Sequence, residues 1–187
     1  MIILGIDPGT RITGYGIIQK RGAQITALDY GCIRPPTNLS LNQRLAIIFE
    51  GLELLLEQHR PEVVAVELQF VLKNVQSAIK LGMAKAMALL AASRRGIPVY
   101  EYAPTRAKQA VVGKGQASKW QVQRMIQSIL QLPSLPEPED AADALALALC
   151  HAGGCSCTNP FAVLSKKKIP QRRSSNALVS RIDSRSH

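Results

Sequence analysis

Apolar positions in the first part of the chain form short continuous runs separated by turn residues. Residues 1–6 are apolar throughout, and the run stops at Asp7, immediately before a Pro-Gly pair. A short apolar run that ends in a turn is typical of a strand buried on both faces. Residues 12–18 and 24–33 predict two more strands, connected by a glycine-containing turn as an antiparallel hairpin.

The pattern then changes to the spacing of amphipathic helices. Leucines and isoleucines at this spacing predict a helix over residues 41–59, and residues 63–67 follow as another buried strand. Because a helix connects them, this strand is expected beside the first one and parallel to it. Further helices are predicted over residues 75–94 and 118–130 and from 139 onward, with a short helix from 104 and a strand over 97–102. The order predicts an α/β fold with a five-stranded mixed sheet flanked by helices.

Two glycines, Gly14 and Gly16, leave one face of the second predicted strand without side chains. Such a face lets a backbone segment or a phosphate approach closely. A local kink of the strand is the alternative interpretation, and the pattern alone does not separate the two.

Carboxylates occur where the predicted elements end or begin. Asp7 and Glu67 each end a buried strand, while Asp140 and Asp143 share one face at the start of the last helix. A turn hydrogen bond for Asp7 and helix-dipole stabilisation for the helical pair are the simpler explanations. If all four converge, they repel one another unless a cation lies between them. Ligand sets made only of oxygen suit Mg²⁺, with Mn²⁺ as a substitute.

Positive charge dominates and is unevenly distributed. The net charge is +10, and residues 153–187 contain seven basic residues and one acidic residue. This composition favours a polyanionic partner such as nucleic acid. The chain is therefore divided into a compact domain, residues 1–152, and a basic tail, residues 153–187, expected to be mostly disordered.

Two further features suggest contacts with DNA. Lys114 lies in a glycine-containing loop before the helix predicted over 118–130, where backbone amides and lysines can hold a phosphate. Phe70 follows the strand that ends at Glu67 and could stack on a nucleobase. A solvated loop and an aromatic that closes the core are the respective alternatives. The chain has neither an uninterrupted apolar run of membrane-spanning length nor a signal-peptide pattern, so a cytoplasmic location is expected.

Several motifs together resemble the RuvC family of Holliday junction resolvases. They are GIDPG at 5–9, TGYG at 13–16, VE at 66–67, KLG at 80–82, VVG at 111–113 and DAADA at 140–144. The resemblance extends from residue 1 to about 151 and implies a ribonuclease-H-like fold. It also implies a Mg²⁺-dependent homodimeric endonuclease that nicks two opposed strands of a four-way DNA junction and works with branch-migration proteins of the RuvA and RuvB type.

The same resemblance assigns roles to individual residues. It implies that Asp7, Glu67, Asp140 and Asp143 are the catalytic metal ligands. The DNA-contacting residues that it implies are Phe70, Lys108 and Lys119. Two other functions are compatible with parts of the pattern: an ATPase of the actin or sugar-kinase type, and a non-catalytic nucleic-acid-binding module. Metal-dependent cleavage of a synthetic junction separates all three.

Overall fold

The computed structural model describes residues 1–68 and 75–155, so Phe70 and nearly all of the basic tail lie outside the described residues. The described elements are β1 (Ile2–Asp7), β2 (Thr13–Arg21), β3 (Gln24–Ile33), α1 (Leu41–His59), β4 (Val63–Glu67), α2 (Val75–Arg94), β5 (Val99–Tyr102), α3 (Pro104–Val112), α4 (Lys119–Leu130) and α5 (Glu139–Ala152). All the predicted helices and strands are present. Some boundaries differ from the prediction. Strand β2 runs on to Arg21 instead of ending at residue 18, and β5 begins at Val99 instead of residue 97. The short helix that begins at residue 104 extends to Val112, because Val111 is buried in the core.

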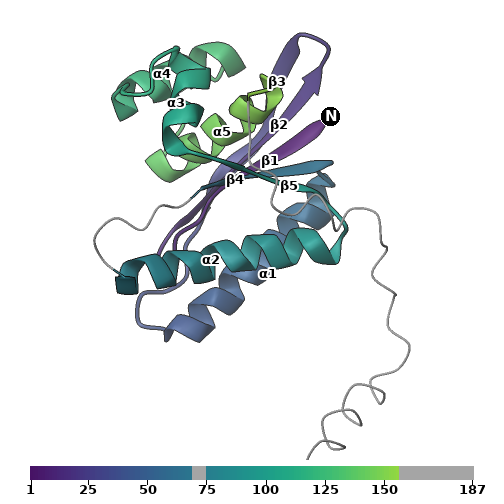
Figure 1. The fold of residues 1–187 in the computed structure, drawn as a ribbon. Coiled ribbons are helices and arrows are strands. Elements are labelled where there is room, and N and C mark those ends of the chain that lie inside the picture. The colour runs from purple at the N-terminus through teal and green to yellow at the C-terminus, as the bar shows by residue number, and fades with distance from the viewer. Residues whose placement is uncertain (69–74, 156–187) are drawn as a thin grey trace, which may run out of the picture.

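The five strands form one mixed sheet in the order β3-β2-β1-β4-β5. Strands β1, β2 and β3 are antiparallel neighbours, whereas β4 is parallel to both β1 and β5. The predicted adjacency of β1 and β4 is thus confirmed. Helices α1 and α2 cover one face of the sheet, and α3, α4 and α5 cover the other (Figure 1).

Each face of the sheet has its own hydrophobic core. In β1, Ile3 packs in the core beneath α5, whereas Leu4 and Ile6 pack in the core beneath α1 and α2. Side chains of a strand alternate between faces, so a sheet covered on both sides requires apolar residues at every position. This double burial explains the uninterrupted apolar runs of β1 and β4.

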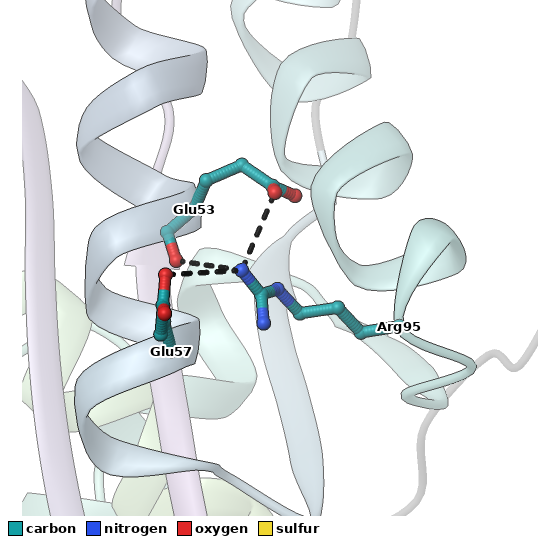
Figure 2. A network of polar contacts seen from close by, with 3 residues as sticks. All are labelled: Glu53, Glu57 and Arg95. Carbon is teal, nitrogen blue, oxygen red and sulfur yellow. Dashed lines mark hydrogen bonds and ion pairs between the residues drawn. The ribbon is translucent and has the colours of Figure 1, made fainter.

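Polar contacts fasten α2 to its surroundings. Just beyond α2, the Arg95 guanidinium donates to the carbonyl oxygen of Glu53 at 3.2 Å and forms an ion pair with the Glu53 carboxylate at 3.3 Å. Glu57, one turn further along α1, lies 3.9 Å from the same nitrogen (Figure 2). On the sheet side, Lys85 pairs with the buried Glu101 of β5 at 2.7 Å. The close contacts of Arg95 with Glu53 thus join the end of α2 to α1, and the Lys85–Glu101 pair joins α2 to the sheet.

The large apolar side chains of α2 do not face the core. Its buried residues are Ala84, Ala88, Ala91 and Ala92, while Val75, Ile79, Met83 and Leu90 are between 40% and 66% exposed. By length and composition alone, α2 is apolar enough to cross a membrane, although no uninterrupted apolar run of that length occurs. Its alanine face and its ion pair to β5 instead make it a layer of this domain, and no element within residues 1–68 and 75–155 covers its apolar outer face.

Candidate active site

Two strands deliver carboxylates to the same face of the sheet. Ile6 of β1 is paired with Val66 of β4, so the next residues, Asp7 and Glu67, end neighbouring parallel strands side by side. Asp7 continues the alternation of Ile3, and both therefore face α5. The carboxyl ends of parallel strands are a common place for ligands in α/β sheets.

Three glycines let α5 lie almost directly on this face. A Cβ atom at Gly5 would stand 1.9 Å from the carbonyl oxygen of Ala144, and one at Gly14 would stand 2.0 Å from that of Asp140. At Gly16 a Cβ would meet the Leu145 side chain at 2.7 Å. The glycine face predicted to admit a backbone or a phosphate therefore admits the backbone of α5. This close approach brings the first turn of α5 down to the ends of β1 and β4.

Burial and mutual repulsion raise the pKa values of two of the acids, Asp7 and Asp143. Burial raises the pKa of Asp7 to about 9, helped by a side-chain hydrogen bond and charge repulsion from Glu67, and by repulsion from Asp143 and Asp140. The pKa of Asp143 is also raised, chiefly by burial, and this effect is opposed by the positive charge of Lys119. Without a metal, a pKa this high favours the protonated form of Asp7 at neutral pH.

This donor set fits a divalent cation. Among residues 1–68 and 75–155, no three His, Cys, Asp or Glu side chains are already gathered tightly enough to hold a metal ion. The raised pKa of Asp7 nevertheless shows that this position disfavours uncompensated negative charge. A cation relieves that cost by replacing the proton, and metal binding is then linked to proton release. Carboxylate oxygens are the ligands that Mg²⁺ and Mn²⁺ prefer.

A basic rim borders the acids. A cleft of about 150 Å³ is lined by Glu67, Lys108, Lys119 and Asp143, together with Pro104, Ala107, Ala146 and Leu147. Two of the predicted DNA-contacting lysines thus share a cleft with two of the predicted metal ligands. Asp7 and Asp140 are not among its lining residues. Lys114 is exposed on the loop before α4 and does not line this cleft either.

One neighbour of this cleft was missed by the sequence analysis. Glu139, the first residue of α5, accepts a hydrogen bond from Lys119 at 2.7 Å, while Asp143 lies 3.9 Å from the same ammonium. The pKa of Lys119 is raised, first by the hydrogen bond to Glu139 and also by the charge of Asp143. The contact joins residues 20 positions apart on different helices, and no local spacing rule predicts such a pair.

Comparisons with known proteins agree with this architecture. The model of the family described as crossover junction endodeoxyribonuclease RuvC matches residues 3–151. The RuvC protein of Protochlamydia amoebophila is 60% identical over 152 residues, which are 81% of this chain and 90% of that protein. The RuvC protein of Citrifermentans bemidjiense is 54% identical, over 81% of this chain and 92% of the relative.

Solved structures give the same result. The structure described as Thermus thermophilus RuvC in complex with a Holliday junction substrate superposes with a TM-score of 0.77 at 37% identity, covering 82% of this chain and 94% of that one. The yeast mitochondrial Holliday junction resolvase Ydc2, at 14% identity and a TM-score of 0.58 over 81% of this chain and 78% of its own, shares the fold. The mixed five-stranded sheet with helices on both faces is a ribonuclease-H-like fold. The chain belongs to the RuvC family of crossover junction endodeoxyribonucleases.

Proposed function

We propose that this chain is a structure-specific endodeoxyribonuclease that resolves four-way DNA junctions by paired nicks in opposed strands, during recombination and repair. The observation that carries the proposal is the position of Asp7, at the end of a buried strand, with its pKa raised to about 9 by burial and three other acids. The lysine-lined cleft beside these acids suits a DNA backbone. Its place of action is the cytoplasm, where chromosomal DNA of a bacterial cell is found.

In this proposal Asp7, Glu67, Asp140 and Asp143 hold Mg²⁺, which Mn²⁺ can replace. When bound, the cation stabilises negative charge on the scissile phosphate and lowers the pKa of the attacking water. Lys108 and Lys119 approach the phosphate backbone from the cleft wall and fix the position of the strand. Lys119 must exchange its hydrogen bond with Glu139 for a phosphate oxygen when DNA arrives.

The decisive experiment measures cleavage of a synthetic four-way junction and of a duplex with the same sequence, with Mg²⁺ and with a chelator. Symmetric, Mg²⁺-dependent nicks restricted to the junction are expected. ATP hydrolysis without nicking would favour the ATPase alternative, and junction binding without nicking would favour the non-catalytic module. Either result would overturn the proposal.

The active form is proposed to be a homodimer, because opposed nicks require two active sites. The exposed apolar face of α2 supports this, and so does Gly82 in the middle of that helix, where an added Cβ would meet nothing within 4 Å. A glycine inside a helix costs about 1 kcal/mol relative to alanine, so a second helix packed closely against it provides a reason for its presence. Branch-migration proteins of the RuvA and RuvB type are proposed as further partners.

Ile79→Glu should therefore convert the dimer to a monomer. Ile79 is 53% exposed, and a surface substitution of this kind changes the stability of an isolated chain by only about 0.5 kcal/mol. Buried in a dimer interface, the unpaired carboxylate should weaken association at least about tenfold. Light scattering after size-exclusion chromatography gives the molar mass. Leu54→Glu on α1, at a residue 66% exposed, is the matched control and should remain dimeric. A wild-type protein that is monomeric both free and bound to a junction would contradict the dimer.

Deleting residues 156–187 should reduce non-specific DNA affinity without impairing catalysis. These residues contain all seven basic side chains of the tail, whereas Cys155, which packs against the core, is retained. For each phosphate that the tail neutralises in the full-length protein, the deletion should flatten the log–log salt dependence of duplex binding by about 0.9. Binding across a salt series and single-turnover cleavage test this. An unchanged slope would show that the tail does not contact the DNA backbone, and a collapsed cleavage rate would show that the tail is needed for catalysis. A lower melting temperature would show that the tail packs on the folded domain.

A further inference from the structure

The first turn of α4 exposes the single tryptophan of the chain. The Trp120 side chain is 61% exposed. The guanidinium carbon of Arg124, one helical turn later, lies 5.5 Å from the centre of the Trp120 ring. A guanidinium over an aromatic face is a favourable cation–π arrangement. It stabilises the ring in an outward position and leaves much of it available to a ligand.

All the charged residues in the stretch of sequence around this pair are basic. Residues 103–136, which include α3 and α4, contain five Lys and Arg residues and no Asp or Glu. The remainder of residues 1–152 contains eleven basic and twelve acidic residues. The positive charge of the folded domain is therefore concentrated in this segment, on the sheet face that α5 also covers (Figure 1). Charge complementarity favours a polyanion as the ligand.

Within α4, Trp120 lies apart from the other exposed apolar side chains. The other exposed apolar residues of α4 are Met125 and Ile129. At 3.6 residues per turn they lie about 140° and about 180° around the helix axis from Trp120. Arg124, by contrast, lies about 40° away, on the same face. The aromatic ring is thus paired with a cation and separated from the apolar residues, an arrangement used for single-stranded nucleic acid.

The pair also lies next to the proposed catalytic cleft. Lys119, the residue before Trp120, lines that cleft and reaches to 3.9 Å from the carboxylate of Asp143. Consecutive helical residues point about 100° apart, so the ring is directed away from the cleft while remaining near it. A DNA strand whose phosphate enters the cleft has its neighbouring nucleotides within reach of this helix.

We infer that Trp120 and Arg124 form a stacking site for a nucleobase that the junction exposes near its branch point. The inference rests on the proposed function, since it concerns the same DNA. In a continuous duplex, both faces of every base are covered by neighbouring bases, so a tryptophan has no free face to stack on. Bases at a branch point lose a stacking neighbour, and Trp120 replaces it while Arg124 binds the adjacent phosphate. The site therefore adds affinity for branched over continuous DNA.

Intrinsic fluorescence tests this directly, because Trp120 is the only tryptophan. The full-length protein is titrated in chelator with a four-way junction, a duplex and a single strand of matched sequence, while labelled DNA reports binding independently. Saturation with the junction or the single strand should quench the emission strongly, whereas saturation with the duplex should quench it little. Equal quenching by duplex would indicate a groove contact and overturn the inference, as would junction binding with no change in emission.

Substitutions at Trp120 distinguish stacking of an aromatic ring on a base from contact with any large apolar side chain. Trp120→Leu should weaken junction binding by about fivefold or more, since stacking on one base corresponds to roughly 5- to 150-fold in affinity. Trp120→Phe should retain most of the affinity, and duplex binding should be the same for both variants. Met125→Leu is the control on another face of α4 and should behave as wild type. Equal affinities for Trp120→Leu and Trp120→Phe would overturn the inference. If the wild-type protein neither bound nor cleaved the junction, both the proposed function and the stacking site would be wrong. If the wild type cleaved the junction but the Trp120 variants bound it as tightly as the wild type, only the stacking site would be wrong.

Discussion

Asp7→Asn should abolish junction cleavage while leaving junction binding almost unchanged. The other three acids all raise the pKa of Asp7, and asparagine would place a neutral amide where the proposed function needs a charged oxygen to hold a cation. Loss of several kcal/mol of transition-state stabilisation corresponds to a decrease of at least about a thousandfold in single-turnover rate. Binding should persist, because phosphate contacts by basic residues supply most of the affinity.

Although Asp7→Asn should lose activity, it should be more stable than the wild type in the absence of metal. The folded-state pKa of Asp7 is about 9 against an ordinary value of 3.8. The unfolded chain releases this proton at lower pH than the folded chain, so the wild type loses stability as pH rises from about 4 to about 9. Asparagine has no carboxyl proton to release, so the Asp7→Asn variant does not lose stability in this way as the pH rises. At pH 7.5 without metal, the variant should melt about 2–8 °C higher if the relief is worth about 1–2 kcal/mol.

Cleavage assays at saturating Mg²⁺ and thermal melts with and without Mg²⁺ test both parts. Glu57→Gln removes a largely exposed carboxylate of α1, on the other side of the sheet, and should cleave and melt as wild type. Added Mg²⁺ should raise the melting temperature of the wild type and that of Glu57→Gln, but raise that of Asp7→Asn much less. Near-normal cleavage by Asp7→Asn would remove Asp7 from the proposed metal ligands.

Gly14→Ala should damage both the fold and the site. The added Cβ would stand 2.0 Å from the carbonyl oxygen of Asp140 and 2.4 Å from its carbonyl carbon. Both partners are backbone, so no side-chain rotation relieves the clash and α5 must move away from β2. Overpacking of this kind costs about 3 kcal/mol, or a decrease of about 6–12 °C in melting temperature for a domain of this size. A displacement of about 1 Å at Asp140 should also lower the cleavage rate about a hundredfold.

Gly153→Ala, at the other end of α5, is the matched control. Its backbone is in the right-handed region, and its nearest contact to an added Cβ would be an ordinary 3.5 Å to the carbonyl oxygen of Leu149. This variant should melt within about 2 °C of wild type. Cleavage measured well below both melting temperatures separates the displaced acid from simple unfolding. Wild-type stability and cleavage in Gly14→Ala would show that α5 does not need the close approach.

Much of the fold was predictable because strands that are buried on both faces appear in the sequence as uninterrupted apolar runs. Strands β1 and β4 are covered by helices on both sides, so nearly every position is apolar and the first polar residue marks the strand end. The same rule located Asp7 and Glu67. The electrostatic effect of Glu67, Asp140 and Asp143 on Asp7 agrees with the predicted convergence, while their role as metal ligands stays a prediction.

Other features of the structure depend on how helices pack in three dimensions, which local sequence patterns do not predict. The outward orientation of the large α2 side chains follows from the packing of its alanines inside the domain, since both faces of that helix are apolar in sequence. The pair of Lys119 with Glu139 depends on how α4 lies against α5. The exposure of Trp120 likewise depends on which side of α4 meets the core.

The sequence by itself determined the order of the elements and the positions of the acids along the chain, because periodicity and turn chemistry are local properties. It also marked the glycines of β2 as a place of close approach. Only the tertiary structure decided what approaches them, because the register of β1 against β2 aligns Gly5 with Gly16 and Asp7 with Gly14 beneath α5. The contact of these glycines with α5 is long-range in the sequence, and it places Asp7 close enough to Asp140 and Asp143 for their charges to raise its pKa.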